Sequence, residues 1–336
     1  MNREQEDMQF LGLYGVYKES FKIILSWRNI FSQITLTLVL PFSFIFLIHI
    51  QISHFLYRKI IHNIEEIIET PQGTPQYQNL SDMITSEYAT FWLFKLVYFT
   101  FLFIFLLLST SAVVYTIASF YTARDITFSK VMSVIPMVLK RLMVTFMCTI
   151  FAFLAYNAMA VFIFIVYALT IGVQSGGILG LVVIGILYLI GFVYLAVVWQ
   201  LSSVVTVLED SYGVEAMMMS NELIKGKMGL SLLIFLKLIV SFILVQFLFK
   251  KVEVVFVHGW RLSLVDRTAF GMLRFLMMSH LFIFGLVLQS VLYFVCKSYQ
   301  YQNIDESDLL DDLEDYHGEY YEPLKAKDVH QEQSHV

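Results

Sequence analysis

The sequence predicts an all-α integral membrane protein with six transmembrane helices, arranged as three hairpins, and a disordered acidic C-terminal tail. Hydrophobic residues make up 58% of the 336 residues and charged residues only 15%, whereas soluble domains are about half apolar and a quarter charged. Six apolar stretches reach the roughly 20 residues with which a helix crosses about 30 Å of hydrocarbon. They contain no Asp or Glu and lie at 33–52, 96–121, 142–169, 178–201, 229–249 and 275–295.

These spans divide the chain into a cytoplasmic amphipathic N-terminal segment (1–30), a six-span membrane domain (31–298) and an acidic cytoplasmic tail (299–336). The first thirty residues lack a basic start followed by a short apolar core, so we expect no cleavable signal peptide and insertion through the first span. The tail holds eleven acidic residues against Lys325 and Lys327. Such a charge density cannot bury a core, which predicts a solvated, disordered tail.

Basic residues flank the spans on alternate sides, and short loops rich in Lys and Arg stay in the cytoplasm. They lie before the first span, between the second and third, between the fourth and fifth, and after the sixth: Lys18, Lys22, Arg28, Arg124, Lys130, Lys140, Arg141, Lys225, Lys227 and Lys297. Both termini are therefore predicted to be cytoplasmic. The loop at 250–274 is also basic and disagrees with this pattern, so its topology is left open.

The first non-cytoplasmic loop, 60–88, contains Asn79-Leu80-Ser81, the sole Asn-x-Ser/Thr triplet of the chain. Asn79 is therefore a candidate glycosylation site, and a glycan there would support the orientation. The alternative is a triplet that occurs by chance.

Each cytoplasmic segment before an odd-numbered span combines an amphipathic stretch with a basic end. Apolar residues recur at helical spacing before the first span (Phe10, Leu13, Tyr14, Tyr17, Phe21, Ile24), the third (Phe128, Val131, Met132, Ile135, Val138) and the fifth (Met217, Met218, Ile224). The pattern predicts three hairpins, each preceded by an amphipathic helix at the cytoplasmic face. The alternative is that any amphipathic linker at a membrane surface looks similar.

No catalytic or metal-binding constellation is evident. The histidines His49, His54, His258 and His280 are scattered, and His49 and His54, five residues apart, do not share a helix face well. A nucleophile elbow, a phosphate-binding glycine loop and an intramembrane carboxylate pair are all missing from the sequence. We therefore expect no metal, no cofactor and no enzymatic activity, with a lipid-processing enzyme as the third alternative.

Polar residues inside the spans are a better lead, because they usually face the bundle or a cavity. A possible intramembrane polar path comprises Asn157, Gln200, Lys237 and Gln289. Lys237 lies about 12 Å past the inner end of its span at 1.5 Å per residue. It either extends toward the inner membrane face or serves transport or lipid-headgroup binding. Glu209 and Asp210 are its expected ionic partners.

The tail contains patterns that resemble sorting signals. Tyr301 with Ile304, and Tyr321 with Leu324, fit a tyrosine-based pattern, and Asp305 with Leu309 and Leu310 fits an acidic dileucine pattern. Vesicle-coat adaptors are the partners such peptides would bind by strand addition. The alternative is an acidic tail with incidental tyrosines and leucines. Cys296, at the end of the sixth span, is a possible palmitoylation site.

Four segments carry distinctive sequence: VLEDSYGVEA at 207–216, SNELIKGK at 220–227, YFVCKSY at 293–299 and GEYYEPLK at 318–325. They resemble a plant family of uncharacterised six-span transmembrane proteins, sometimes labelled poly(A)-binding-protein-binding proteins. The linker between the fourth and fifth spans is more distantly similar to the membrane domain of bacterial glycerophosphodiester phosphodiesterases. The resemblance implies a six-span membrane protein, and it carries over no catalytic residue because this chain has no phosphodiesterase domain.

Together these observations predict a multi-pass protein of the endomembrane system or the plasma membrane, with the lipid bilayer as its main partner and no nucleic-acid contact. The expected role is non-enzymatic, in membrane organisation or trafficking. The alternative is a small-solute or lipid transporter that uses the polar path between the helices.

Overall fold

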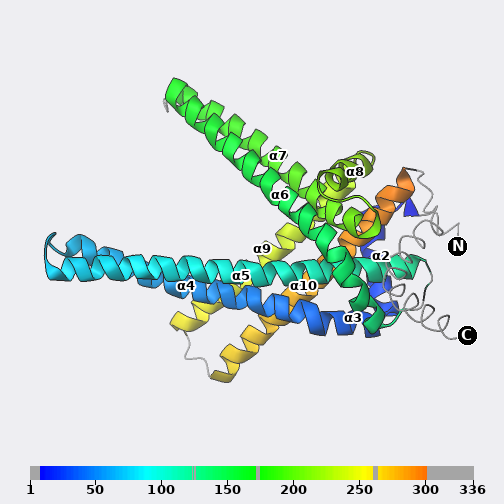
Figure 1. Cartoon of the computed structure of the whole chain (residues 1–336), viewed down its shortest axis with the longest axis horizontal. Helices are drawn as coiled ribbons and strands as arrows, with labels where there is room; N and C mark the ends of the chain where they lie inside the picture. The colour runs from blue at the N-terminus through cyan, green and yellow to red at the C-terminus, as the bar shows by residue number, and fades with distance from the viewer. Residues whose placement is uncertain (1–7, 123, 125, 172–174, 260–263, 301–336) are drawn as a thin grey trace, which may run out of the picture. The chain divides into compact units, whose positions relative to one another are not determined.

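The computed structural model describes residues 8–122, 124, 126–171, 175–259 and 264–300, and within them the chain is helical with no strand (Figure 1). The helices are α2 (Leu13–Ser26), α3 (Arg28–Ile34), the π-helical turn η1 (Thr35–Val39), α4 (Leu40–Glu69), α5 (Pro75–Tyr121), α6 (Phe128–Ile171), α7 (Ser175–Leu208), α8 (Val214–Ile224), α9 (Met228–Gly259) and α10 (Leu264–Tyr299).

Six helical segments of the described chain are long and apolar enough to cross a membrane, which confirms the predicted all-α, six-span class. They are Arg28–Glu69, Pro75–Tyr121, Phe128–Thr170, Gly177–Leu208, Met228–Lys251 and Thr268–Tyr299. The chain divides into two compact units: the first comprises residues 1–33, 110–244 and 283–336, and the second comprises residues 34–109 and 245–282.

The first unit has its core at the ends of α5, α6, α7 and α10 that lie nearest the linker between α7 and α8. Small apolar side chains such as Ala112, Ala118 and Val204 are fully buried there. Buried hydroxyls lie among them and bond to their own helix: Thr116 donates to the Ala112 carbonyl at 2.7 Å, and Ser290 donates to the Leu286 carbonyl at 2.9 Å. Such residues let helices approach closely while each hydroxyl keeps a partner.

Helix α2 packs one face on this core and leaves another exposed. Val16, Ser20 and Ile23 are buried, whereas Tyr14 is 82% exposed and Leu25 is 69% exposed. The predicted amphipathic helix before the first span is therefore present, and so is the one before the fifth span, α8. Before the third span the amphipathic stretch is not a separate helix, because α6 runs from Phe128 through Pro136 into the span without a break.

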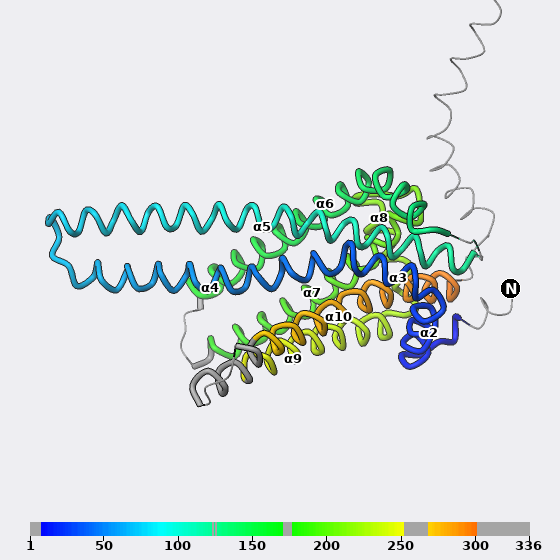
Figure 2. The backbone as a smooth tube through the Cα atoms, turned by 90° about the horizontal axis from the view of Figure 1, so that it is seen from below, coloured from blue at the N-terminus to red at the C-terminus, as the bar shows by residue number. Residues whose placement is uncertain are grey.

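The second unit contains most of α4, which lies alongside α5 (Figure 2). Asn63 donates to Glu87 at 2.7 Å and Lys59 lies 3.0 Å from the same carboxylate. Nearer the other end of α4, the ring of His49 stacks on that of Tyr98 with centroids 3.5 Å apart. These contacts join the two helices over most of the length of α4.

The segment 60–88, predicted as a loop between two spans, is mostly helical, because both flanking helices continue through it. Only a short turn separates Glu69 from Pro75. Thr74 caps α5, since its hydroxyl accepts a hydrogen bond from the Tyr77 amide at 3.2 Å, and Pro75 suits the first helical position. Gly73 makes the turn possible with φ +88°.

The predicted loop at 250–274 is also mostly helical. Helix α9 runs to Gly259 and α10 begins at Leu264. Arg274, predicted to lie in that loop, is in α10, where its guanidinium group donates to the Gln246 side chain of α9. The described basic residues of this segment, Lys250, Lys251, Arg267 and Arg274, therefore lie within the helices.

Candidate functional site

The linker between α7 and α8, residues 209–213, is the most highly connected polar segment of the first unit. It begins where the Glu209 amide bonds to the Val205 carbonyl at 2.8 Å and ends at Gly213. Gly213 has φ +66°, in the left-handed region that costs a side chain about 1–2 kcal/mol. Its amide donates to the Thr145 hydroxyl of α6 at 2.8 Å, and that hydroxyl also lies 2.9 Å from Thr206 on α7.

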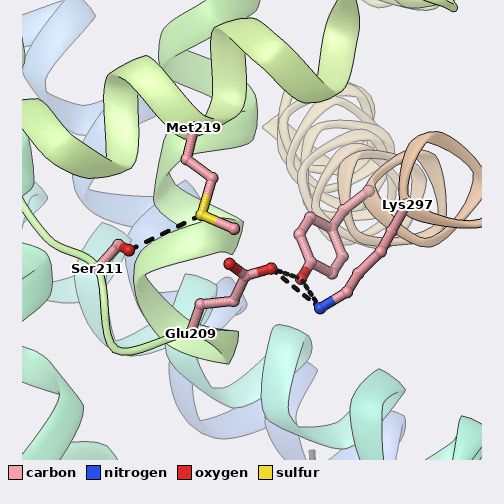
Figure 3. Close-up of polar contacts among 5 residues, drawn as sticks. Glu209, Ser211, Met219 and Lys297 are labelled. Carbon is pink, nitrogen blue, oxygen red and sulfur yellow. Dashed lines mark hydrogen bonds and ion pairs between the residues drawn. The ribbon is translucent and has the colours of Figure 1, made fainter. Parts of the chain in front are cut away.

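Glu209 joins the linker to α10 (Figure 3). The Lys297 ammonium donates to Oε1 of Glu209 at 3.1 Å, and the Tyr293 hydroxyl donates to the same oxygen. Lys297 also donates to the Tyr293 hydroxyl at 3.2 Å, which closes a three-membered network. The side chain of Glu209 is 12% exposed and that of Lys297 is 18% exposed, so solvent screens this pair much less than a surface pair.

A second ion pair joins the linker to α6. The Arg141 guanidinium donates to Asp210, whose side chain is 78% exposed. Exposed pairs of this kind contribute little to stability. The next residue, Ser211, donates a weak hydrogen bond to the Met219 sulfur of α8 at 3.7 Å, as Figure 3 shows.

Helix α8 is anchored on the opposite side of the linker. The buried Ser220 hydroxyl donates to the Val198 carbonyl of α7 at 2.8 Å, and Tyr194 of α7 donates to Asn221. The Gln300 side chain, after α10, donates to the Glu222 carbonyl. We call the linker and its partners on α6, α7, α8 and α10 the linker clamp. Its charged groups are engaged with one another, an arrangement suited to holding helices in register.

None of these groups is arranged as a metal centre: among the described residues, no three His, Cys, Asp or Glu side chains are placed to hold an ion. Within the clamp, Oε1 of Glu209 accepts hydrogen bonds from both Tyr293 and Lys297.

The four residues of the predicted polar path all lie in the first unit. Asn157 donates to the Phe153 carbonyl of its own helix and accepts from Tyr188 of α7, at 2.7 and 2.8 Å. Gln289 is buried, Gln200 is partly buried and Lys237 is exposed. In the described part of the chain no hydrogen bond joins any two of the four. The path remains a prediction without a shared contact to support it.

The expected ionic partners of Lys237 were wrong. Glu209 pairs with Lys297 and Asp210 pairs with Arg141, whereas the Lys237 ammonium lies 4.4 Å from the ring centroid of Tyr17 on α2. The sequence did contain a signal for this contact. The amphipathic N-terminal stretch is rich in aromatic residues, and it was expected at the inner membrane face, toward which Lys237 was expected to extend in one of the two alternatives. Partial burial raises the pKa of the Tyr17 hydroxyl, so the ring beneath the ammonium stays neutral.

Asn79 is exposed in the second turn of α5, so the candidate glycosylation site lies on a helix. Cys296 is fully buried, which disfavours its palmitoylation in this conformation, and that modification stays a prediction. The predicted sorting residues Tyr301, Ile304, Asp305, Leu309, Leu310, Tyr321 and Leu324 lie outside the described residues.

Sequence reasoning missed the contact between Lys95 and His49 in the second unit. Their nitrogens, Nζ and Nε2, lie 2.8 Å apart. Lys95 directly precedes the apolar stretch at 96–121 that was predicted as the second span, so it was not considered among the polar residues inside the spans. An extension of that span by one helical turn toward its N-terminus would have revealed it.

The fold and the linker clamp define a polytopic helical membrane protein whose charged residues link helix ends. The family model described as Domain of unknown function (DUF8558) matches residues 1–334, and the chain belongs to this family. No curated protein and no solved structure matches the chain.

Proposed function

We propose that this protein has a non-enzymatic role in membrane organisation or trafficking, in the endomembrane system or the plasma membrane, with both termini in the cytoplasm. The observation that supports this role best is the second face of α2. Tyr14, Phe21 and Leu25 are exposed on it, and Lys18 and Lys22 are exposed beside them. A helix with an apolar face flanked by lysines is suited to the boundary between headgroups and acyl chains.

The three-hairpin arrangement is part of the same proposal. Helices α2 and α8 each precede a span, and each buries one side while apolar residues such as Met218 remain exposed on another. In this arrangement each hairpin enters the bilayer from a helical segment at the cytoplasmic surface. The linker clamp then fixes the third hairpin to the second through Glu209 and Lys297.

The acidic tail supplies the trafficking element of the proposal. Its tyrosine-based and dileucine patterns are short linear signals that a vesicle-coat adaptor can bind in an extended conformation. These patterns come after Lys297 and the end of α10 in the sequence. We therefore place them on the cytoplasmic side of the membrane.

The test is a tail variant in which Tyr301, Leu309, Leu310 and Tyr321 are replaced by Ala. We expect the full-length variant to move to another membrane compartment while its thermal unfolding is unchanged. A matched control replaces Leu313, Tyr316 and Tyr320 by Ala, which keeps all three patterns intact. Unchanged steady-state location and internalisation of the first variant would reject the sorting role.

A further inference from the structure

Lys237 lies on a side of α9 that faces away from the protein. Its neighbours on the same side, Leu233, Val240 and Leu244, are each more than half exposed, and Leu236 is 40% exposed. In a membrane-spanning helix such a surface contacts acyl chains. The ammonium group of Lys237 is therefore a charge at the lipid-facing surface, where an unpaired charge is costly.

No carboxylate in the described part of the chain lies within ion-pairing distance of Lys237. Two acidic residues of the first unit have other partners: Glu19 pairs with Lys22, and Glu209 pairs with Lys297. The contact of Lys237 is instead the Tyr17 ring, 4.4 Å from Nζ to the centroid. A cation over an aromatic face is stabilised without being neutralised, so its positive charge remains available.

The ring that holds the ammonium is itself held in place. The Tyr17 and Phe284 rings have centroids 5.5 Å apart, and Phe21, one turn further along α2, lies 4.7 Å from the same Phe284 ring. Because Phe284 belongs to α10, residues from α2, α9 and α10 meet at this point. An ammonium ion has three N–H donors, and since the side chain is exposed, donors not directed at the ring point outward.

We propose that Lys237, supported by Tyr17, binds the phosphate of an anionic phospholipid headgroup in the leaflet into which α2 inserts. The lipid would place its acyl chains along the exposed leucines and valine of α9, and its phosphate would accept hydrogen bonds from Nζ. Lys18, the residue that follows Tyr17 in α2, is also exposed and adds positive charge near this point. This inference rests on the proposed position of α2 at the membrane surface but not on the sorting role, because it involves no residue of the tail.

The test is lipid binding to the full-length protein, measured by native mass spectrometry after reconstitution in phosphatidylcholine vesicles that contain increasing amounts of phosphatidylserine. We expect Lys237→Met to weaken binding of the first phosphatidylserine about fivefold, and Lys237→Arg to retain it. Lys140→Met is the matched control, because it removes an exposed lysine of α6 in the same unit, away from the contact of α2, α9 and α10, and it should change binding less than twofold.

A second pair of variants tests the site without removing the charge. Tyr17→Leu removes the ring beneath the ammonium and should weaken binding roughly twofold to fivefold, whereas Tyr17→Phe keeps the ring and should not. Equal binding by the Lys237→Met and Lys140→Met variants would overturn the proposal. Equal affinity of the native protein for phosphatidylserine and for phosphatidylcholine would also overturn it. Displacement of phosphatidylserine by millimolar inorganic phosphate would overturn it too, because it would assign the site to a soluble anion.

Discussion

The carboxylate of Glu209 and the ammonium of Lys297 lie 3.1 Å apart, although 88 residues separate them along the chain. Both side chains are mostly buried, and the fully buried Tyr293 donates to the same carboxylate oxygen. Removal of one partner from such a pair leaves the other charge uncompensated, which costs more than the pair itself contributes. The pair is therefore the most sensitive point of the linker clamp.

Replacement of Glu209 by Ala is expected to lower the free energy of unfolding by about 2 kcal/mol, because Lys297 and Tyr293 lose their acceptor. The measurement is thermal unfolding of the purified full-length protein in detergent. Asp210→Ala is the control: it removes the neighbouring acid, which is largely exposed, and should cost less than about 1 kcal/mol. Equal melting temperatures for the two variants would contradict the role given to Glu209.

Gly213→Ala should destabilise the protein by about 1–2 kcal/mol, because its φ of +66° is unfavourable for a residue with a Cβ. Space is not the cause, since an added Cβ would meet Cys148 Sγ at an ordinary 3.5 Å. Gly229→Ala is the matched control: it lies in α9 with nothing within 4 Å of the added atom, and Ala is the better helix former. It should therefore be neutral or stabilising in the same unfolding measurement.

The contact of Asn63 with Glu87 should hold the α4–α5 pair in register. Glu87→Ala leaves the buried Asn63 amide without its 2.7 Å partner, which costs about 1–3 kcal/mol. We expect faster hydrogen exchange of the backbone amides from Ile60 to Glu69. Glu66→Ala, which removes an exposed carboxylate from the same helix, should leave those rates unchanged. Equal hydrogen-exchange rates in the native protein and in the Glu87→Ala and Glu66→Ala variants would show that the polar contact does not hold the two helices in register.

A glycan at Asn79 would fix the side of the membrane on which the turn between α4 and α5 lies. We expect Asn79→Gln and Ser81→Ala each to abolish a mobility shift that a glycosidase also removes, because each destroys the acceptor triplet. Ser86→Ala, one helical turn beyond that triplet, is the control and should retain the shift. A shift that persists in the Asn79 and Ser81 variants would place the glycan elsewhere.

The six spans could be predicted from the sequence because they depend on a property of single residues, their hydrophobicity, summed over about 20 positions. The helical continuation of α4 to Glu69 could not, since residues 60–88 were taken as a loop on the strength of their charged residues. Its isoleucines at 60, 64 and 67 follow the 3-4 spacing of a helix seam, and that periodicity was the overlooked signal.

The partners inside the site were less accessible to sequence reasoning. Glu209 and Asp210 were expected to pair with Lys237, but their partners come from α10 and α6. The sequence alone does not determine which helices meet. Lys237 was singled out for its position, and its aromatic partner was missed because the search was for opposite charge. The acidic patterns of the tail remain predictions.

The length of α4 and α5 has a steric consequence. At 1.5 Å per residue, α4 continues about 25 Å beyond Ile52, where the predicted first span ends, before the turn at Gly73 reverses the chain. On whichever side of the bilayer it emerges, this rod of two helices is several times longer than the depth of a headgroup layer. A partner that approaches along the axis of this helix pair would meet the turn at Gly73 first.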